Sequence, residues 1–123
     1  MPKIMVVDDD EGFTTLYKDY LRMAGFDAIS ENHSAKAMEL AYSEMPDAFV
    51  LDLMMPEPSG FQLCRMLRAD SNFKRTPIII VTALTDLDSK MVAMGAGAND
   101  YLTKPFHIDE LKARIDSLLE KAE

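Results

Sequence analysis

The sequence lacks the residues that mark several protein classes: it has no tryptophan, one cysteine, five glycines and six prolines in 123 residues. Because Cys64 is alone, no disulfide can form within the chain, and nothing requires an oxidising compartment. No apolar stretch approaches the roughly 20 residues that span a bilayer. These absences predict a cytoplasmic protein with no membrane anchor, and the low glycine and proline content excludes collagen-like and disordered chains.

The charge balance is acidic, with 21 acidic against 13 basic residues and a formal net charge of -8. Such a surface opposes direct binding to nucleic acid or anionic membrane. No DNA-binding helix-turn-helix is recognisable, so protein partners or cations are favoured. The length fits one hydrophobic core, and we expect residues 1–123 to form a single domain.

Strand-like and helical patterns alternate five times, which predicts an α/β fold with a mostly parallel sheet. Apolar runs place strands at about 3–7, 27–30, 47–51, 78–81 and 99–103, the last at an edge. Helical periodicity places helices at about 11–24, 34–44, 59–69, 85–94 and 108–123. Ser59 with Gln62 predicts a capping box, and Thr85 with Asp88 predicts another helix cap.

Polar residues stand where the predicted strands end. We call them the strand-end cluster: Asp8, Asp9, Asp52, Thr82 and Lys104. The carboxyl ends of parallel strands share one edge of the sheet, and ligands bind at that edge in open α/β sheets. For the carboxylates to act together, the first and third strands must be neighbours. The flavodoxin-like, doubly wound order 2-1-3-4-5 with five helices satisfies this condition.

Three carboxylates in a small cleft repel one another unless a cation compensates them. An all-oxygen site suits Mg²⁺ or Mn²⁺. Zinc has little support, because neither histidine follows a strand and Cys64 has no companion. Taken singly, the aspartates could form a solvated loop that caps the first helix, Lys104 could be a surface lysine, and Thr82 could make a local turn. Only their joint arrangement favours a cation and phosphate site.

Six short segments resemble the receiver domain of two-component response regulators, the CheY-like family. They match in order and spacing over essentially the whole chain: Val6–Asp10, Asp52–Pro56, Ser59–Gly60, Thr82–Ala83, Gly97–Leu102 and Thr103–Phe106. Each segment alone is a weak signal, whereas the set is specific. The resemblance implies a phosphorylation-activated switch rather than a turnover enzyme.

The resemblance also implies a role for each aspartate. Asp52 would accept a phosphoryl group from a phosphohistidine on a sensor histidine kinase or phosphotransfer protein. Asp9, Asp52 and the backbone carbonyl of Met54 would bind Mg²⁺, with Mn²⁺ as a substitute, and Asp8 would hold a metal-bound water. These roles agree with the oxygen-ligand site inferred from the carboxylates.

Further residues would sense the phosphoryl group. By the resemblance, Lys104, the Thr82 hydroxyl and the backbone N–H of Ala83 contact it, and the bond before Pro105 is cis. Thr82 then moves and Tyr101 swings inward, which alters the face formed by the fourth helix, last strand and last helix. Without the resemblance, Tyr101 would be interpreted as an ordinary edge-strand aromatic residue.

Two positions differ among receivers and help to set how long the phosphoryl group lasts. Here they are Met54 and Leu84, whose apolar side chains cannot orient an attacking water, so we expect slow dephosphorylation.

Four charged residues stand where receivers of the OmpR/PhoB-like class form salt bridges across a two-fold dimer: Lys90, Asp100, Glu110 and Arg114. A homodimer is therefore one expectation. The alternative is that these residues only solvate the surface, because exposed ion pairs are weak.

Three other functions are alternatives to this one. A flavodoxin-like ligand-binding domain would place a flavin phosphate beside Asp8, Asp9 and Asp10, which would repel it. An aspartyl-phosphate hydrolase would need an acid two residues after Asp52, where Met54 stands. A degenerate receiver, acting as a phosphorylation-independent interaction module, would not need the intact strand-end cluster.

Overall fold

The apolar runs form a parallel sheet. The computed structural model describes residues 1–122, and its strands lie in the order β2-β1-β3-β4-β5 with all neighbours parallel. Their bounds are β1 Lys3–Val7, β2 Asp27–Glu31, β3 Ala48–Leu51, β4 Ile78–Thr82 and β5 Asp100–Thr103. Every residue of β3 and β4 is buried, as expected of strands covered on both faces. The predicted fold class and strand order, with β5 at an edge, are confirmed.

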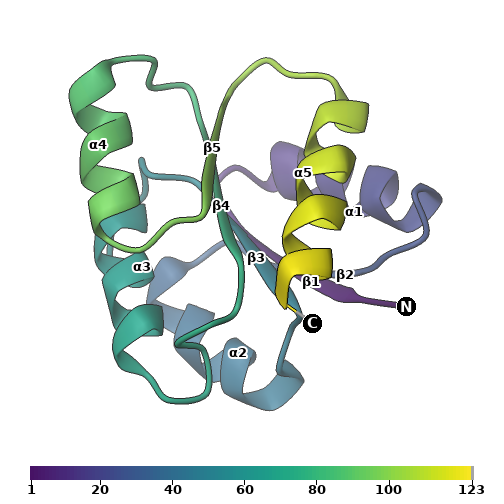
Figure 1. Cartoon of the computed structure of the whole chain (residues 1–123), viewed down its shortest axis with the longest axis horizontal. Helices are drawn as coiled ribbons and strands as arrows, with labels where there is room; N and C mark the ends of the chain where they lie inside the picture. Colours follow the sequence, from purple (N-terminus) through teal and green to yellow (C-terminus); the bar gives the residue numbers. More distant parts are fainter. Residues whose placement is uncertain (123) are drawn as a thin grey trace.

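Helices cover both faces of the sheet (Figure 1): α1 and α5 lie on one face, and α2, α3 and α4 on the other. Their bounds are α1 Glu11–Met23, α2 Ala37–Glu44, α3 Gly60–Ala69, α4 Leu87–Gly95 and α5 Ile108–Ala122. The helix predicted from residue 34 begins instead with a separate 3-10 turn, Ser34–Lys36. None of the helices within residues 1–122 combines the length and apolar character needed to cross a membrane.

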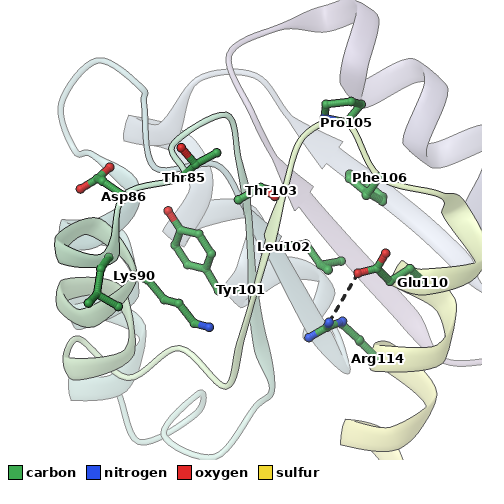
Figure 2. Close-up of a pocket in the computed structure, with 11 residues that line it drawn as sticks. Thr85, Asp86, Lys90, Tyr101, Leu102, Thr103, Pro105, Phe106, Glu110 and Arg114 are labelled. Carbon is green, nitrogen blue, oxygen red and sulfur yellow. Dashed lines mark hydrogen bonds and ion pairs between the residues drawn. The ribbon is translucent and has the colours of Figure 1, made fainter.

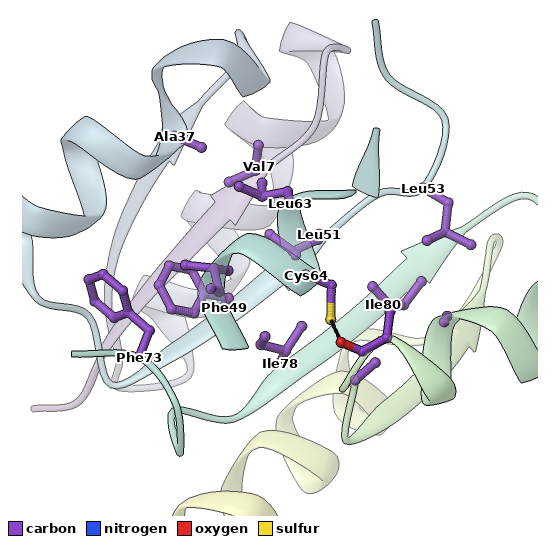
Figure 3. Close-up of a cluster of buried hydrophobic side chains, with 14 of the residues drawn as sticks. Val7, Ala37, Phe49, Leu51, Leu53, Leu63, Cys64, Phe73, Ile78 and Ile80 are labelled. Atoms are coloured by element: carbon purple, nitrogen blue, oxygen red, sulfur yellow. Dashed lines mark hydrogen bonds between the residues drawn. The ribbon is translucent and has the colours of Figure 1, made fainter. Parts of the chain in front are cut away.

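Alternation along the strands divides the buried side chains into two cores. In β1, Met5 and Val7 face the α2–α3–α4 layer, whereas Ile4 and Val6 face the α1–α5 layer. Figure 3 shows the first of these cores, in which Phe49 packs edge-on against Phe73 with ring centroids 5.5 Å apart. Close packing on both faces fixes where each strand ends, and so fixes the positions of the residues that follow.

The helix starts follow the predicted capping chemistry with one exception. Ser59 and Gln62 form both hydrogen bonds of a capping box. The cap predicted at Thr85 and Asp88 is wrong, because Asp86 is the N-cap of α4 and accepts from the Ser89 backbone N–H at 2.9 Å. Thr85 and Asp88 have the same spacing, but it is the Asp86 carboxylate that accepts from both the backbone N–H and the hydroxyl of Ser89, so the helix begins one residue later than predicted from Thr85.

The apolar stripe of α1 is only partly covered. Tyr17 and Leu21 are buried, but Leu16 and Tyr20 remain 43% and 39% exposed. The helical period places all four residues on the apolar side of α1, but it does not determine how much of that side the sheet and α5 cover. Leu16 and Tyr20 consequently line a groove with Phe106, which precedes α5.

Candidate functional site

The sheet brings the carboxylates of the strand-end cluster together. Val7 and Leu51 are paired in adjacent strands, so Asp8 and Asp52 follow side by side. The Asp52 backbone N–H donates to the Val7 carbonyl at 3.0 Å, which extends this pairing by one residue. Carboxylate oxygens of Asp8, Asp9 and Asp52 all lie within 4.8 Å of one another. The predicted convergence of three carboxylates is therefore present.

Lys104 reaches this group from the loop after β5. Its ammonium donates to Asp8 Oδ2 at 2.7 Å and to Asp52 Oδ2 at 3.1 Å. Burial alone would lower the pKa of Lys104, but the hydrogen bond and charge of Asp8, together with Asp52, raise it above its ordinary value. Lys104 is therefore a fixed cation and not a solvated surface lysine.

One ammonium does not balance three carboxylates. Burial raises the pKa of Asp8 above its ordinary value, and the Lys104 hydrogen bond only partly offsets that rise. Asp9, in contrast, is exposed to solvent. Two buried carboxylates and one open carboxylate, all offering oxygen, fit a hard divalent cation that keeps part of its water shell.

The carboxylate of Asp52 is held from two directions. While Lys104 binds Oδ2, the Met54 backbone N–H donates to Oδ1 at 3.2 Å. The Met54 side chain is 60% exposed, so it lies at the open side of the site. Thr82 is fully buried at the end of β4, and Ala83 follows it at the surface.

The start of α3 packs directly against the backbone of Asp52. The Gly60 N–H donates to the Leu53 carbonyl at 3.1 Å. A Cβ on Gly60 would overlap the Asp52 carbonyl oxygen, so only glycine allows this approach. The start of α3 therefore fixes the position of the Asp52 backbone at the edge of the sheet.

Tyr101 lies inward in this structure. The residue is 8% exposed, and its hydroxyl donates to the Leu84 carbonyl at 2.9 Å. Burial, with the charges of Asp86 and Asp52, raises its pKa. Figure 2 shows the ring between α4 and β5, with its hydroxyl toward Thr85. A swing of Tyr101 on phosphorylation stays a prediction.

The four residues of the predicted dimer contact lie on what we call the α4–β5–α5 face, defined by Lys90, Asp100, Glu110 and Arg114. Arg114 pairs within the chain with Asp100 at 2.6 Å and with Glu110 at 3.4 Å. Lys90 reaches from α4 on the opposite side of the same pocket (Figure 2). The structure gathers all four residues on one face of a single chain.

Two contacts of the site were not predicted. The Asn32 side chain donates to the Asp8 carbonyl and to the Thr14 hydroxyl, each at 2.9 Å. The Phe13 ring lies against Lys104, with Nζ 4.0 Å from the ring centroid. The helical pattern at 11–24 includes Phe13 but gives no reason to place it beside Lys104. The cis bond expected before Pro105 is present, and a second precedes Pro58.

The chain matches a known family over most of its length. The family model for the response regulator receiver domain covers residues 4–116. The DNA-binding dual master transcriptional regulator RpaA of Synechocystis sp. is 38% identical over 123 residues, which is 100% of this chain and 51% of that protein. The alkaline phosphatase synthesis transcriptional regulatory protein PhoP of Bacillus subtilis is 37% identical over 121 residues, 98% of this chain and 50% of that protein. The chain thus spans about half the length of these relatives.

Solved structures agree closely with the fold. The receiver domain of Francisella response regulator 1452 has a TM-score of 0.92 and 34% identity, and the match covers 100% of both chains. The BeF3-activated N-terminal receiver domain of Klebsiella pneumoniae RstA has a TM-score of 0.89 and 33% identity, covering 95% of this chain and 97% of the other. The likeness extends across the whole sheet and both helical layers.

Proposed function

The chain belongs to the response regulator receiver domain family, and from this premise we propose that Asp52 accepts a phosphoryl group from a phosphohistidine on a partner kinase or phosphotransfer protein. One observation carries the proposal. The two oxygens of Asp52 are held separately, by Lys104 at 3.1 Å and by the Met54 backbone N–H at 3.2 Å, with two further carboxylates beside them. This setting orients a nucleophile and concentrates cations around it.

In the transfer, an Asp52 oxygen forms the new bond to phosphorus. The phosphorus–nitrogen bond of the donor breaks, and its electron pair leaves with the imidazole. Catalysis of this kind depends on alignment and on neutralising the phosphoryl oxygens. Lys104, the Thr82 hydroxyl and the Ala83 backbone N–H are the groups that we assign to those oxygens. Bound Mg²⁺, or Mn²⁺ in its place, would supply further positive charge, held by Asp9, Asp52 and the Met54 carbonyl with Asp8 on a metal-bound water.

The output is proposed to run through Tyr101 to the α4–β5–α5 face, which would then bind a partner or a second copy of the chain. RpaA is described as DNA-binding and is about twice as long. We infer a role in transcriptional signalling for the protein that carries this domain, without direct nucleic-acid contact by residues 1–123. The single-domain organisation and the cytoplasmic location stay predictions.

Incubation with acetyl phosphate and Mg²⁺, followed by intact-mass measurement, tests the acceptor. We expect one phosphoryl adduct in the wild type and none in Asp52→Asn. Asp47→Asn is the matched control, because it changes a carboxylate at the opposite end of the same strand, exposed to solvent. A wild type that forms no adduct would favour a phosphorylation-independent interaction module. An adduct that persists in Asp52→Asn would place the acceptor elsewhere.

We further propose that the phosphoryl group is long-lived. The exposed Met54 side chain and the half-buried Leu84 border the site with apolar groups that cannot orient water for attack. The double variant Met54→Asn, Leu84→Glu should therefore lose its adduct at least several-fold faster than the wild type. Adduct decay followed by intact mass after removal of the donor measures this, and equal decay rates would refute the proposal.

A further inference from the structure

The ammonium of Lys104 has more donors than the carboxylates use. A lysine carries three N–H groups, and Asp8 and Asp52 each accept one from Nζ. The Lys104 side chain is only 11% exposed, so water reaches little of it. The ammonium also lies over the Phe13 ring, whose centroid is 4.0 Å from Nζ. At this distance a ring face attracts a cation through its quadrupole.

The Phe13 ring is itself held in place by other aromatic residues. Its centroid lies 5.6 Å from that of Tyr17, and Tyr17 lies 5.5 Å from Phe106. Tyr17 is buried, whereas Phe106 belongs to the loop that carries Lys104. The three rings therefore connect α1 to this loop, and Phe13 has a fixed position relative to Lys104.

We propose that Phe13 is a positioning residue for phosphoryl transfer, which holds the Lys104 ammonium at the depth where it meets the incoming phosphoryl oxygens. This inference rests on the proposed function of Asp52. When Asp52 becomes an acyl phosphate, Lys104 exchanges its contact with the Asp52 carboxylate for contacts with the phosphoryl oxygens. The ring contact does not depend on which of these anionic partners is present, so it holds the ammonium before and after transfer.

The variant Phe13→Leu removes the aromatic face and keeps an apolar side chain. We expect the rate constant for adduct formation with acetyl phosphate and Mg²⁺ to fall about fivefold, which corresponds to about 1 kcal/mol at 1.4 kcal/mol per tenfold. Phe13→Tyr retains the face and should restore the wild-type rate. Tyr20→Leu is the matched control, because Tyr20 lines the same groove, whereas the cation–π contact of Lys104 within residues 1–122 is with Phe13.

A merely structural role would also slow Phe13→Leu, so the test includes readouts that packing does not affect. Replacing Phe13 with its mono-, di- and trifluorinated forms weakens the quadrupole at nearly constant shape, and the rate should fall in that order. In a Lys104→Met background, Phe13→Leu should have no further effect, because the cation on which it acts is gone. Circular dichroism and thermal unfolding confirm that each variant is folded.

Three results would overturn the proposal: an unchanged rate in Phe13→Leu, no trend across the fluorinated series, or an equal loss from Phe13→Leu with and without the Lys104 ammonium. Each requires that the wild type form its adduct at Asp52. If the wild type forms no adduct there, the proposed function itself fails. The two failures are therefore distinguishable.

Discussion

Two regions of the molecule use the same charge arrangement in different surroundings. In the strand-end cluster, Lys104 lies between Asp8 and Asp52. On the α4–β5–α5 face, Arg114 lies between Asp100 and Glu110. The cation of the cluster has a side chain that is 11% exposed, against 38% for Arg114. One arrangement is enclosed by the fold and the other faces water.

This difference in burial predicts that the ion pairs of the two regions contribute differently to stability and serve different roles. Charges in an enclosed site interact through little solvent, and removal of one partner leaves the others uncompensated. Exposed pairs are screened by water and salt, and each contributes little. The cluster can therefore hold a fixed geometry for chemistry, whereas Arg114 can exchange its partners within the chain for those of another molecule at small cost.

The largest contrast should come from removing each cation in turn. Without divalent metal at pH 7, Lys104→Met should lower the free energy of unfolding by about 3 kcal/mol, since Asp8 and Asp52 lose their shared partner. Arg114→Met should lower it by less than about 1 kcal/mol. Urea denaturation measures both variants. Similar losses at the two sites would contradict the distinction drawn from burial.

Mg²⁺ should act on the cluster alone. At about 100 times its dissociation constant, it should raise the free energy of unfolding of the wild type by about 2.7 kcal/mol, because it binds only the folded chain. Asp9→Asn should lose most of this gain, whereas Asp100→Asn should keep it. Thermal unfolding across a Mg²⁺ titration measures the response. Equal responses in the two variants would argue against the carboxylates at the strand ends as ligands.

Neutralising one carboxylate of the cluster should stabilise the metal-free protein. Burial raises the pKa of Asp8 above its ordinary value of 3.8, so its ionised form costs stability at any pH above its folded pKa. Asp8→Asn should therefore be more stable than the wild type by about 1 kcal/mol at pH 7. This advantage should shrink as the pH falls through the folded pKa toward 3.8, as followed by urea denaturation. If the stability difference between Asp8→Asn and the wild type grew as the pH fell, ionised Asp8 would not be the form that destabilises the folded chain.

Arg114→Glu on the exposed face should have only a small effect on a single chain, about 1 kcal/mol in stability. Its consequence should appear in association. With beryllofluoride as a phosphoryl mimic, the wild type should sediment as a dimer, and Arg114→Glu should remain a monomer. Association that is equal in the two proteins would exclude Arg114 from the contact.

The same contrast explains what the sequence could predict. Apolar runs identify buried strands, and strands fix where the residues after them lie, so Asp8, Asp52 and Lys104 could be placed together. The exposed face offers no such constraint. The helical spacing of four residues could pair Arg114 with Glu110. The sequence could place Arg114 near Asp100 only by resemblance, and it held no sign that these two residues pair within the chain.

Other details depend on how far one element covers another. Leu16 and Tyr20 follow the helical period and yet remain exposed, because periodicity gives direction and not coverage. The contact of Phe13 with Lys104 depends on a loop some 90 residues later, which the helical period cannot predict. The predicted cap of α4 was one residue too early, at Thr85 and not Asp86, an error within the usual range at helix ends.

Gly60 bears on how this domain tolerates mutation. It carries no charge, contacts no phosphoryl group and takes part in no proton transfer, yet a single methyl group there would collide with the backbone of Asp52. Alanine, the mildest replacement at most positions, should thus be as damaging here as the loss of a functional group. In a mutational survey of the chain, a position without any chemistry of its own would score among the essential ones.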